Sequence, residues 1–315
     1  MLVRIDTNYS FPAIEKQLPD GKKHWNDIYF TTEKVRDCDF LIVINKPTEE
    51  IICNCRKGGK WLIVQEPPYR LSGIDFSYFK YFDRVYCQFP KQINKNIINS
   101  QTCLPWHVSH SFDELISMKL NYELKHDNLS WITSNKEKYP GHNKRLEFMK
   151  LLMETNLHFD LYGRGFNYLK KKEDGLNSYK YTLAIENYNG AHYWTEKISD
   201  AFLCYTMPIY YGCTNISDYF PEKSFIQIDI QNLNQSYETI QKAIINNSWQ
   251  KNLDFIIQSR NLILYKYQLY PFIYHEINRL PGFQKDASLH KNIIPLNPGK
   301  DSLFTRLRRR TIRLK

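Results

Sequence analysis

Short continuous apolar runs, separated by polar segments, dominate the first third of the chain. Runs of this length are typical of strands that are buried on both faces of a parallel sheet. The stretch KPTEEIICNCRKGGK, residues 46–60, predicts a helix or turn that Gly58 and Gly59 close. No glycine-rich dinucleotide fingerprint follows any of the runs, which argues against a dinucleotide site here. The runs are DFLIVIN (39–45), KWLIVQ (60–65) and RVYCQF (84–89).

A second alternation of strands and helices begins at residue 129. Residues 144–156 (KRLEFMKLLMETN) repeat apolar side chains at helical spacing, and 234–247 and 249–278 are also expected to be helical. Alternation of strands with helices predicts a parallel sheet that is covered by helices on both faces. The expected strands are 129–135, 158–166, 181–187, 207–212 and 224–230, with a further helix from Thr195 to Leu203.

The chain of 315 residues is long enough for two domains, each with its own core. The polar stretch 110–128 is expected to link them. We therefore predict an α/β protein with domains at 1–125 and 126–280, followed by a C-terminal extension with a basic tail at 281–315.

Composition excludes several classes of protein. Hydrophobic residues make up 42% of the chain and aromatic residues 15%, which is incompatible with a disordered chain. No apolar run reaches the roughly 18 residues that a membrane-spanning helix needs. The start, MLVRIDTNYSFP, lacks the apolar core of a signal peptide, so we expect a cytoplasmic protein.

Seven cysteines are present, and most of them lie inside apolar runs. This distribution predicts buried free thiols in a reducing compartment. Cys53 and Cys55 form the one close pair, and they lack a second pair or a histidine at metal-ligand spacing. We therefore predict no metal site.

The net charge of +10 is concentrated in the C-terminal tail. A mildly basic body argues against a nucleic-acid partner. On a helix, the apolar side chains of 301–315 would face away from the arginines, which predicts peripheral binding to an anionic membrane surface, at its cytoplasmic face. A disordered tail that binds nothing is the alternative. The basic residues of the last ten are Arg306, Arg308, Arg309, Arg310, Arg313 and Lys315.

The ends of the expected strands in the second domain carry polar and charged residues. Ligands of open α/β sheets bind beyond the carboxyl ends of the strands, against helix N-termini that attract phosphate. Arg145 and Lys197 would supply the positive charge for a diphosphate, and Tyr193 could donate to a phosphate oxygen. Glu196 could accept both hydroxyls of a ribose. This combination indicates a sugar-nucleotide site, to which Ser134, Asn135, Gly163 and Asn187 also belong.

A purely structural explanation of the same residues is also available. Thr195 could cap a helix, Glu196 could be a first-turn acid that the helix dipole favours, and Lys197 could be a solvated base. Spacing alone does not separate the two interpretations.

The arrangement EN-x5-YWTEK-ISDAF, followed by MPIYYG and YFPEKSFIQI, resembles the donor-binding signature of the α-1,3/4-fucosyltransferases, glycosyltransferase family 10. WITSN, GHNKR and HFDLYGRG are similar to the first donor-domain strand, the arginine and the glycine turn of that family. The resemblance is strong from 129 to 230, moderate from 60 to 108 and absent from the last 35 residues. Tyr188 replaces the serine of the family pattern, and the last motif reads YFPEKSF.

The resemblance implies a GT-B fold, in which two Rossmann-like domains face each other across a cleft. It implies that 126–280 hold GDP-fucose, with Tyr162 among the contacts, and that 1–125 receive an oligosaccharide or glycolipid acceptor. Family members invert the anomeric carbon and need no metal or other cofactor. We expect fucose transfer to a GlcNAc- or glucose-containing glycan, with α-1,3 linkage. Another GDP-sugar as donor, or a silent module that binds glycans or membranes, is the alternative.

An inverting transfer needs a base that takes the proton of the acceptor hydroxyl. Glu66 follows the strand KWLIVQ directly, and Pro67 and Pro68 prevent that strand from continuing. This position matches the base of the family, while an ordinary loop glutamate is the alternative. Trp106 and His107 could line the acceptor site, although a packed tryptophan and a hydrogen-bonded histidine explain them equally well.

Overall fold

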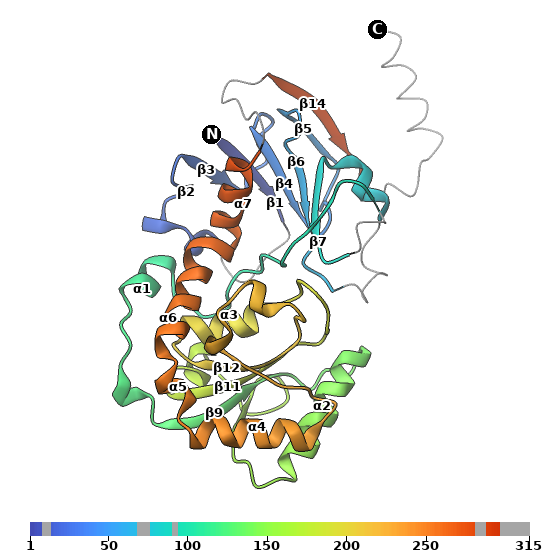
Figure 1. Ribbon diagram of the computed structural model, residues 1–315. Helices are drawn as coiled ribbons and strands as arrows, with labels where there is room; N and C mark the ends of the chain where they lie inside the picture. Colours follow the sequence, from blue (N-terminus) through green and yellow to red (C-terminus); the bar gives the residue numbers. More distant parts are fainter. Residues whose placement is uncertain (8–13, 68–75, 90–93, 281–287, 297–315) are drawn as a thin grey trace. The chain divides into compact units, whose positions relative to one another are not determined.

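The computed structural model describes residues 1–7, 14–67, 76–89, 94–280 and 288–296, and it divides the chain into two compact units (Figure 1). Unit 1 contains the described residues of 1–9, 26–100 and 282–315. Unit 2 contains those of 10–25 and 101–281. The division therefore differs from the boundary that we predict at residue 125, and residues 288–296 belong to the first unit.

Lys125 shows why the segment before it belongs to unit 2. Its side chain is buried, and Nζ donates to the carbonyl oxygens of Leu176 (3.1 Å), Tyr179 (2.9 Å) and Cys204 (2.8 Å) and to Thr206 Oγ1 (2.9 Å). Burial lowers the pKa of Lys125 to about 7, whereas four oxygen acceptors favour its charged form. Lys125, which we expected in the polar linker, thus connects the amino-terminal ends of β11 and β12 in the second sheet.

Unit 1 is built on a parallel sheet in which six strands follow the order β3-β1-β4-β6-β7-β8. Each neighbouring pair is parallel, and Leu62 lies beside Val43 and Val85. The three predicted strands are confirmed as β4, β6 and β7. The six strands are β1 (Leu2–Asp6), β3 (Ile28–Thr31), β4 (Phe40–Ile44), β6 (Lys60–Ile63), β7 (Arg84–Cys87) and β8 (Ile97–Asn99).

The prediction of a helix or turn between β4 and β6 is wrong, because this segment contains the strand β5 (Ile51–Arg56). It pairs in antiparallel fashion with β14 (Leu289–Ile294), which comes from the polar C-terminal stretch. Ile51, Cys53 and Cys55 are buried, whereas Ile52 is exposed. This alternation with a period of two is the strand signal that the glycines and charges around it concealed.

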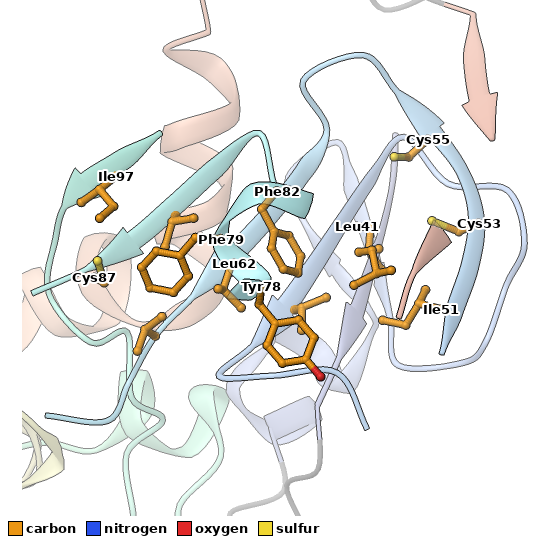
Figure 2. Close-up of a cluster of buried hydrophobic side chains, with 14 of the residues drawn as sticks. Leu41, Ile51, Cys53, Cys55, Leu62, Tyr78, Phe79, Phe82, Cys87 and Ile97 are labelled. Carbon is orange, nitrogen blue, oxygen red and sulfur yellow. The ribbon is translucent and has the colours of Figure 1, made fainter. Parts of the chain in front are cut away.

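The core of unit 1 lies against the sheet and is rich in aromatic side chains (Figure 2). Tyr78, Phe79 and Phe82 pack over Leu41 and Leu62 there. Buried thiols of the same cluster come from β5 and β7. All seven cysteines of the chain are buried and free, as predicted.

Unit 2 contains a parallel sheet of five strands in the order β10-β9-β11-β12-β13. All five correspond to predicted strands, although β10 and β13 are shorter than expected. The strands are β9 (Asp127–Ile132), β10 (Asp160–Tyr162), β11 (Tyr179–Ile185), β12 (Met207–Tyr211) and β13 (Ile226–Gln227), and unit 2 also includes β2 (His24–Trp25).

Helices pack around this sheet in two groups, with α2 against α4 and α3 against α6 (Figure 1). Trp131 of β9 contacts Phe148 of α2, and Phe202 of α3 is fully buried. The helices are α1 (Phe112–Ser117), α2 (Pro140–Met153), α3 (Glu196–Leu203), α4 (Leu233–Ile245), α5 (Ser248–Lys251), α6 (Leu253–Leu262) and α7 (Leu269–Asn278), with a π-helical turn at Ile263–Tyr267.

The predicted α/β fold class, with a parallel sheet in each of two compact units, is confirmed, and the GT-B assignment stays a prediction. A cleft between the two domains stays a prediction. Across the ranges that the structure describes, no helix combines the length and the apolar character needed to span a bilayer.

Candidate functional site

The strand order of unit 2 creates a topological switch point between β9 and β11. From β9 the chain first adds β10 on one side, and it then returns to add β11, β12 and β13 on the other. In open α/β sheets, ligands bind beyond the carboxyl ends of the strands at such a point. Ser134 and Asn135 follow β9, and Glu186 and Asn187 follow β11. The structure thus brings together the two polar strand ends that the sequence predicts.

Helix α2 begins directly against the loop that follows β11. A Cβ atom on Gly141 would lie only 1.7 Å from the carbonyl oxygen of Asn187, so only glycine permits this approach. Asn187 Nδ2 lies 3.3 Å from His142 Nε2, and Tyr193 Oη donates to Asn187 Oδ1 at 3.2 Å. Asn187 and Tyr193 therefore lie side by side at the N-terminus of α2, as the donor-site hypothesis requires.

Arg145 lies one turn further along α2 and is 5% exposed. Its Nη2 atom donates to the carbonyl oxygen of Ser134 at 3.4 Å. Burial opposes the charge on Lys197, Glu186 and Glu196 nevertheless raise its pKa, and the positive charge of Arg145 acts weakly against that rise. The two cations that we predicted for a diphosphate therefore both lie at strand ends, Arg145 beside Ser134 after β9 and Lys197 beside Glu186 after β11.

Helix α3 starts with a cap that is tied to a buried carboxylate. Thr195 is the N-cap residue, and its Oγ1 accepts from Lys197 N. Glu186 Oε1 accepts from Thr195 N at 2.8 Å and from Thr195 Oγ1 at 2.7 Å. The structural explanation of Thr195 as a cap is therefore correct, and the cap also fixes the start of the predicted site.

Charges of alternating sign extend across the N-terminus of α3. Lys197 Nζ lies 2.9 Å from Glu186 Oε2 and 3.5 Å from Glu196 Oε1. Lys172 Nζ lies 3.8 Å from the same Glu196 oxygen and 2.6 Å from Asp200 Oδ2. Lys197 is therefore not a solvated base, because it bridges two carboxylates.

The electrostatics of this group fix the charge states of its central members. Burial opposes the charge on Lys197, but Glu186 and Glu196 outweigh it and raise the pKa of the ammonium group. Burial also opposes ionisation of Glu196, but Lys197 and Lys172 outweigh it and hold the pKa of this carboxyl well below its usual value. Burial raises the pKa of Glu186, and Lys197 counteracts that rise. Glu196 is accordingly a permanent hydrogen-bond acceptor.

A pocket of about 490 Å³ opens beside the ends of β9 and β10. A Cβ atom on Gly163, which has φ +113°, would lie 1.9 Å from Thr133 O, so glycine is required for this turn. A Cβ atom on Gly165 would lie 2.3 Å from the Asn135 side chain. The lining residues are Ile132, Gly163, Arg164, Gly165, Phe166, Tyr168, Leu169 and Lys172. A cationic pocket with an aromatic and aliphatic wall thus adjoins the charged group at α3.

The side chains of Tyr162 and Trp106 hydrogen-bond to other residues of the chain. The hydroxyls of Tyr162 and Tyr179 are 2.8 Å apart, and Tyr179 Oη donates to Asp160. Trp106 is buried, and its Nε1 donates to His110 O at 3.0 Å. The packed alternative therefore describes Trp106 correctly, and no free face of it is left to line an acceptor site.

His107 and Glu66 belong to different units. Glu66 comes shortly after β6 in unit 1, as predicted, and His107 belongs to unit 2. His107 N donates to Asp200 Oδ1 at 2.9 Å, and burial lowers the pKa of its imidazole, which lies near Glu196 and Lys172. Glu66 is half-buried after β6, and Asn45 Oδ1 accepts from the preceding Gln65 N at 2.8 Å. The roles of His107 and Glu66 toward a substrate stay predictions.

Sequence reasoning missed Lys172 and Asp200. Lys172 stands in the run KKK at 170–172, which is typical of a solvated surface, and Asp200 lies inside a helix. The available signal was the spacing of Asp200, which follows Glu196 by four residues and so shares its helix face.

The part of the chain that contains this site matches the model of a known protein family. Residues 122–247 match the model of glycosyltransferase family 10 (fucosyltransferase), C-terminal domain. Every predicted donor contact, from Ser134 to Lys197, falls in this range. The resemblance that the sequence motifs indicate is therefore confirmed for this part of the chain.

Curated relatives and solved structures carry related names. An α-(1,3)-fucosyltransferase of Helicobacter pylori is 39% identical over 77 residues, which are 24% of this chain and 16% of that protein. A putative fucosyltransferase-like protein of Arabidopsis thaliana is 36% identical over 90 residues, 27% of this chain and 18% of that protein. The matched stretches cover less than a fifth of each relative. A crystal structure of an α1,3-fucosyltransferase with GDP superimposes with TM-score 0.48 and 18% identity, over 85% of this chain and 91% of that chain.

Proposed function

We propose, from the glycosyltransferase family 10 domain in residues 122–247, that this chain transfers L-fucose from GDP-fucose to a hydroxyl group of a glycan. The family description and the names of two relatives support fucose as the sugar. The α-1,3 linkage is the one named for the Helicobacter pylori relative, and we adopt it for a GlcNAc- or glucose-containing oligosaccharide or glycolipid acceptor.

The observation that carries the proposal is the placement of two cations at the β9/β11 switch point, Arg145 beside Ser134 and Lys197 beside Glu186, with Glu196 next to Lys197. A buried arginine and a half-buried lysine beyond the strand ends suit a diphosphate, which helix N-termini also attract. A carboxylate that remains ionised suits the two hydroxyls of a ribose. Cations for the phosphates together with a carboxylate for the ribose suit a nucleoside diphosphate that carries a sugar.

In the proposed reaction the acceptor oxygen attacks the anomeric carbon of fucose while the bond from that carbon to the β-phosphate oxygen breaks. Glu66 takes the proton of the acceptor hydroxyl, and GDP leaves with its negative charge balanced by Arg145 and Lys197. Attack opposite to the leaving group inverts the anomeric configuration. Another GDP-sugar would use the same diphosphate contacts, so the choice of fucose depends on the family assignment.

The full chain should release GDP from GDP-fucose when lactose or N-acetyllactosamine is present, and linkage analysis should find a new α-1,3 bond. Turnover should persist in excess EDTA, because two basic side chains take the place of a divalent cation at the diphosphate. A panel of GDP-sugars serves as the control for donor choice. Sugar transfer from GDP-mannose but not from GDP-fucose would favour the alternative in which another GDP-sugar is the donor. Loss of turnover in EDTA with recovery in manganese would overturn the metal-independent mechanism.

The C-terminal tail is proposed to hold the protein at an anionic membrane surface, although residues 297–315 lie outside the described part. Each basic residue near such a surface adds about 1 kcal/mol, so full-length protein should float with anionic liposomes at low salt. A truncation after Lys300 should not float, while its transfer to a soluble acceptor stays within about twofold. High salt should release the full-length chain. Equal flotation of both proteins would exclude the tail as the anchor.

A further inference from the structure

Lys172 is placed firmly although it stands in a lysine run. It begins the short helical turn Lys172–Gly175, and the next residue, Glu173, is 2% exposed. Glu173 accepts a hydrogen bond from Ser109 N at 3.0 Å and a second one from the Ser109 hydroxyl. Lys171 N donates to Asp174 Oδ2 at 3.2 Å. The backbone that carries Lys172 is therefore fixed on both sides of the residue.

The ammonium group of Lys172 is held by a buried carboxylate. Asp200 is fully buried, its Oδ2 atom lies 2.6 Å from Lys172 Nζ, and its Oδ1 atom accepts from His107 N. From this anchor, Nζ lies 3.8 Å from Glu196 Oε1. A continuous series of polar contacts thus leads from the His107 backbone to the Glu196 carboxylate.

Lys197 alone cannot hold Glu196 in one orientation. Its Nζ is closer to Glu186 (2.9 Å) than to Glu196 (3.5 Å), so its attraction is divided between two carboxylates. A bound diphosphate would draw Lys197 further from Glu196. Lys172 is then the remaining cation at Glu196, and its own counterion is Asp200, 2.6 Å away.

We propose that Lys172, anchored by Asp200, is a positioning residue that fixes the Glu196 carboxylate for the ribose of the donor. The inference rests on the proposed function, because it assigns Glu196 to the ribose hydroxyls. It adds two residues, Lys172 and Asp200, that reach the substrate only through Glu196. Lys172 also lines the pocket beside β10, so a donor that entered this pocket would meet the same fixed side chain.

The test compares GDP with 2′,3′-dideoxy-GDP, which lacks the two hydroxyls, by isothermal titration of the full chain. Lys172→Met should weaken GDP binding about tenfold, as the loss of a charge-assisted contact would, and leave dideoxy-GDP binding within about twofold. Lys172→Arg should recover most of the GDP affinity, because it keeps the charge between Asp200 and Glu196. Lys170→Met is the matched control, since it removes an exposed neighbouring charge, and it should change neither affinity.

Equal weakening of both ligands by Lys172→Met would overturn the proposal, since a general loss of structure has that effect. If this variant does not fold, Lys172→Met with Asp200→Asn removes the unpaired buried carboxylate, and the same ratio of affinities is measured in the double variant. Unchanged GDP binding in Lys172→Met would overturn the positioning role while the proposed function stands. A wild-type chain that fails to bind GDP would overturn the proposed function and this inference with it.

Discussion

Replacement of Lys197 by methionine is expected to weaken GDP binding by about a hundredfold. A charge-assisted hydrogen bond contributes roughly 1.5–3 kcal/mol, and each 1.4 kcal/mol corresponds to a factor of ten in affinity. The change also unbalances the site, because three carboxylates would then face two cations and repel a diphosphate. The six groups are Glu186, Glu196, Asp200, Arg145, Lys172 and Lys197.

Isothermal titration of GDP into the full chain measures this effect, and a thermal melt verifies that the variant folds. Adding Glu186→Gln to Lys197→Met restores the balance of charge, so part of the affinity should return although the lost contact does not. Lys150→Met, on the exposed side of α2, is the matched control and should bind GDP as the wild type does. Unchanged affinity in Lys197→Met would remove Lys197 from the donor site and favour its role as a purely structural partner of Glu186.

The sequence predicted strands well where both faces of a strand are buried. The apolar runs of β4, β6 and β12 are continuous because helices or core side chains cover both sides of them. β5 and β14 were missed for the opposite reason. Their pairing joins segments more than 230 residues apart, and one face of the pair exposes Ile52 and Ile293. Neither segment resembles a buried strand when it is considered alone.

In the candidate site too, residues that are neighbours in the sequence could be predicted, whereas contacts that form only in the folded chain could not. Residues 186–197 are contiguous, so their chemistry was visible in the sequence, and α2 brings Arg145 to them through a contact that only Gly141 permits. The ion pairs were not visible, because Lys172 reaches Asp200 and Glu196 only after the chain has folded. Sequence reasoning assigned Lys197 to a diphosphate, which stays a proposal, and overlooked that Lys197 pairs with Glu186 and Glu196.

Replacement of Glu66 by glutamine is expected to lower kcat by a factor of about 10²–10⁴, the contribution of a general base. Glutamine has nearly the same shape and cannot accept the proton. Asn45 Oδ1 accepts from Gln65 N, a contact that the substitution does not remove, so this part of the turn should be kept in the variant. GDP affinity should stay within about twofold, because the donor residues belong to unit 2 and Glu66 belongs to unit 1.

Steady-state transfer to lactose, with GDP titration in parallel, separates the chemical step from donor binding. Glu50→Gln removes an exposed carboxylate of the same unit and should leave kcat unchanged, which makes it the matched control. A loss of kcat with intact GDP binding would also exclude the silent-module alternative, since such a module has no turnover to lose. Full activity in Glu66→Gln would mean that Glu66 is an ordinary loop glutamate and that another group takes the acceptor proton. His107 would then be the next residue to test, because burial lowers the pKa of its imidazole and so favours the neutral form that a base requires.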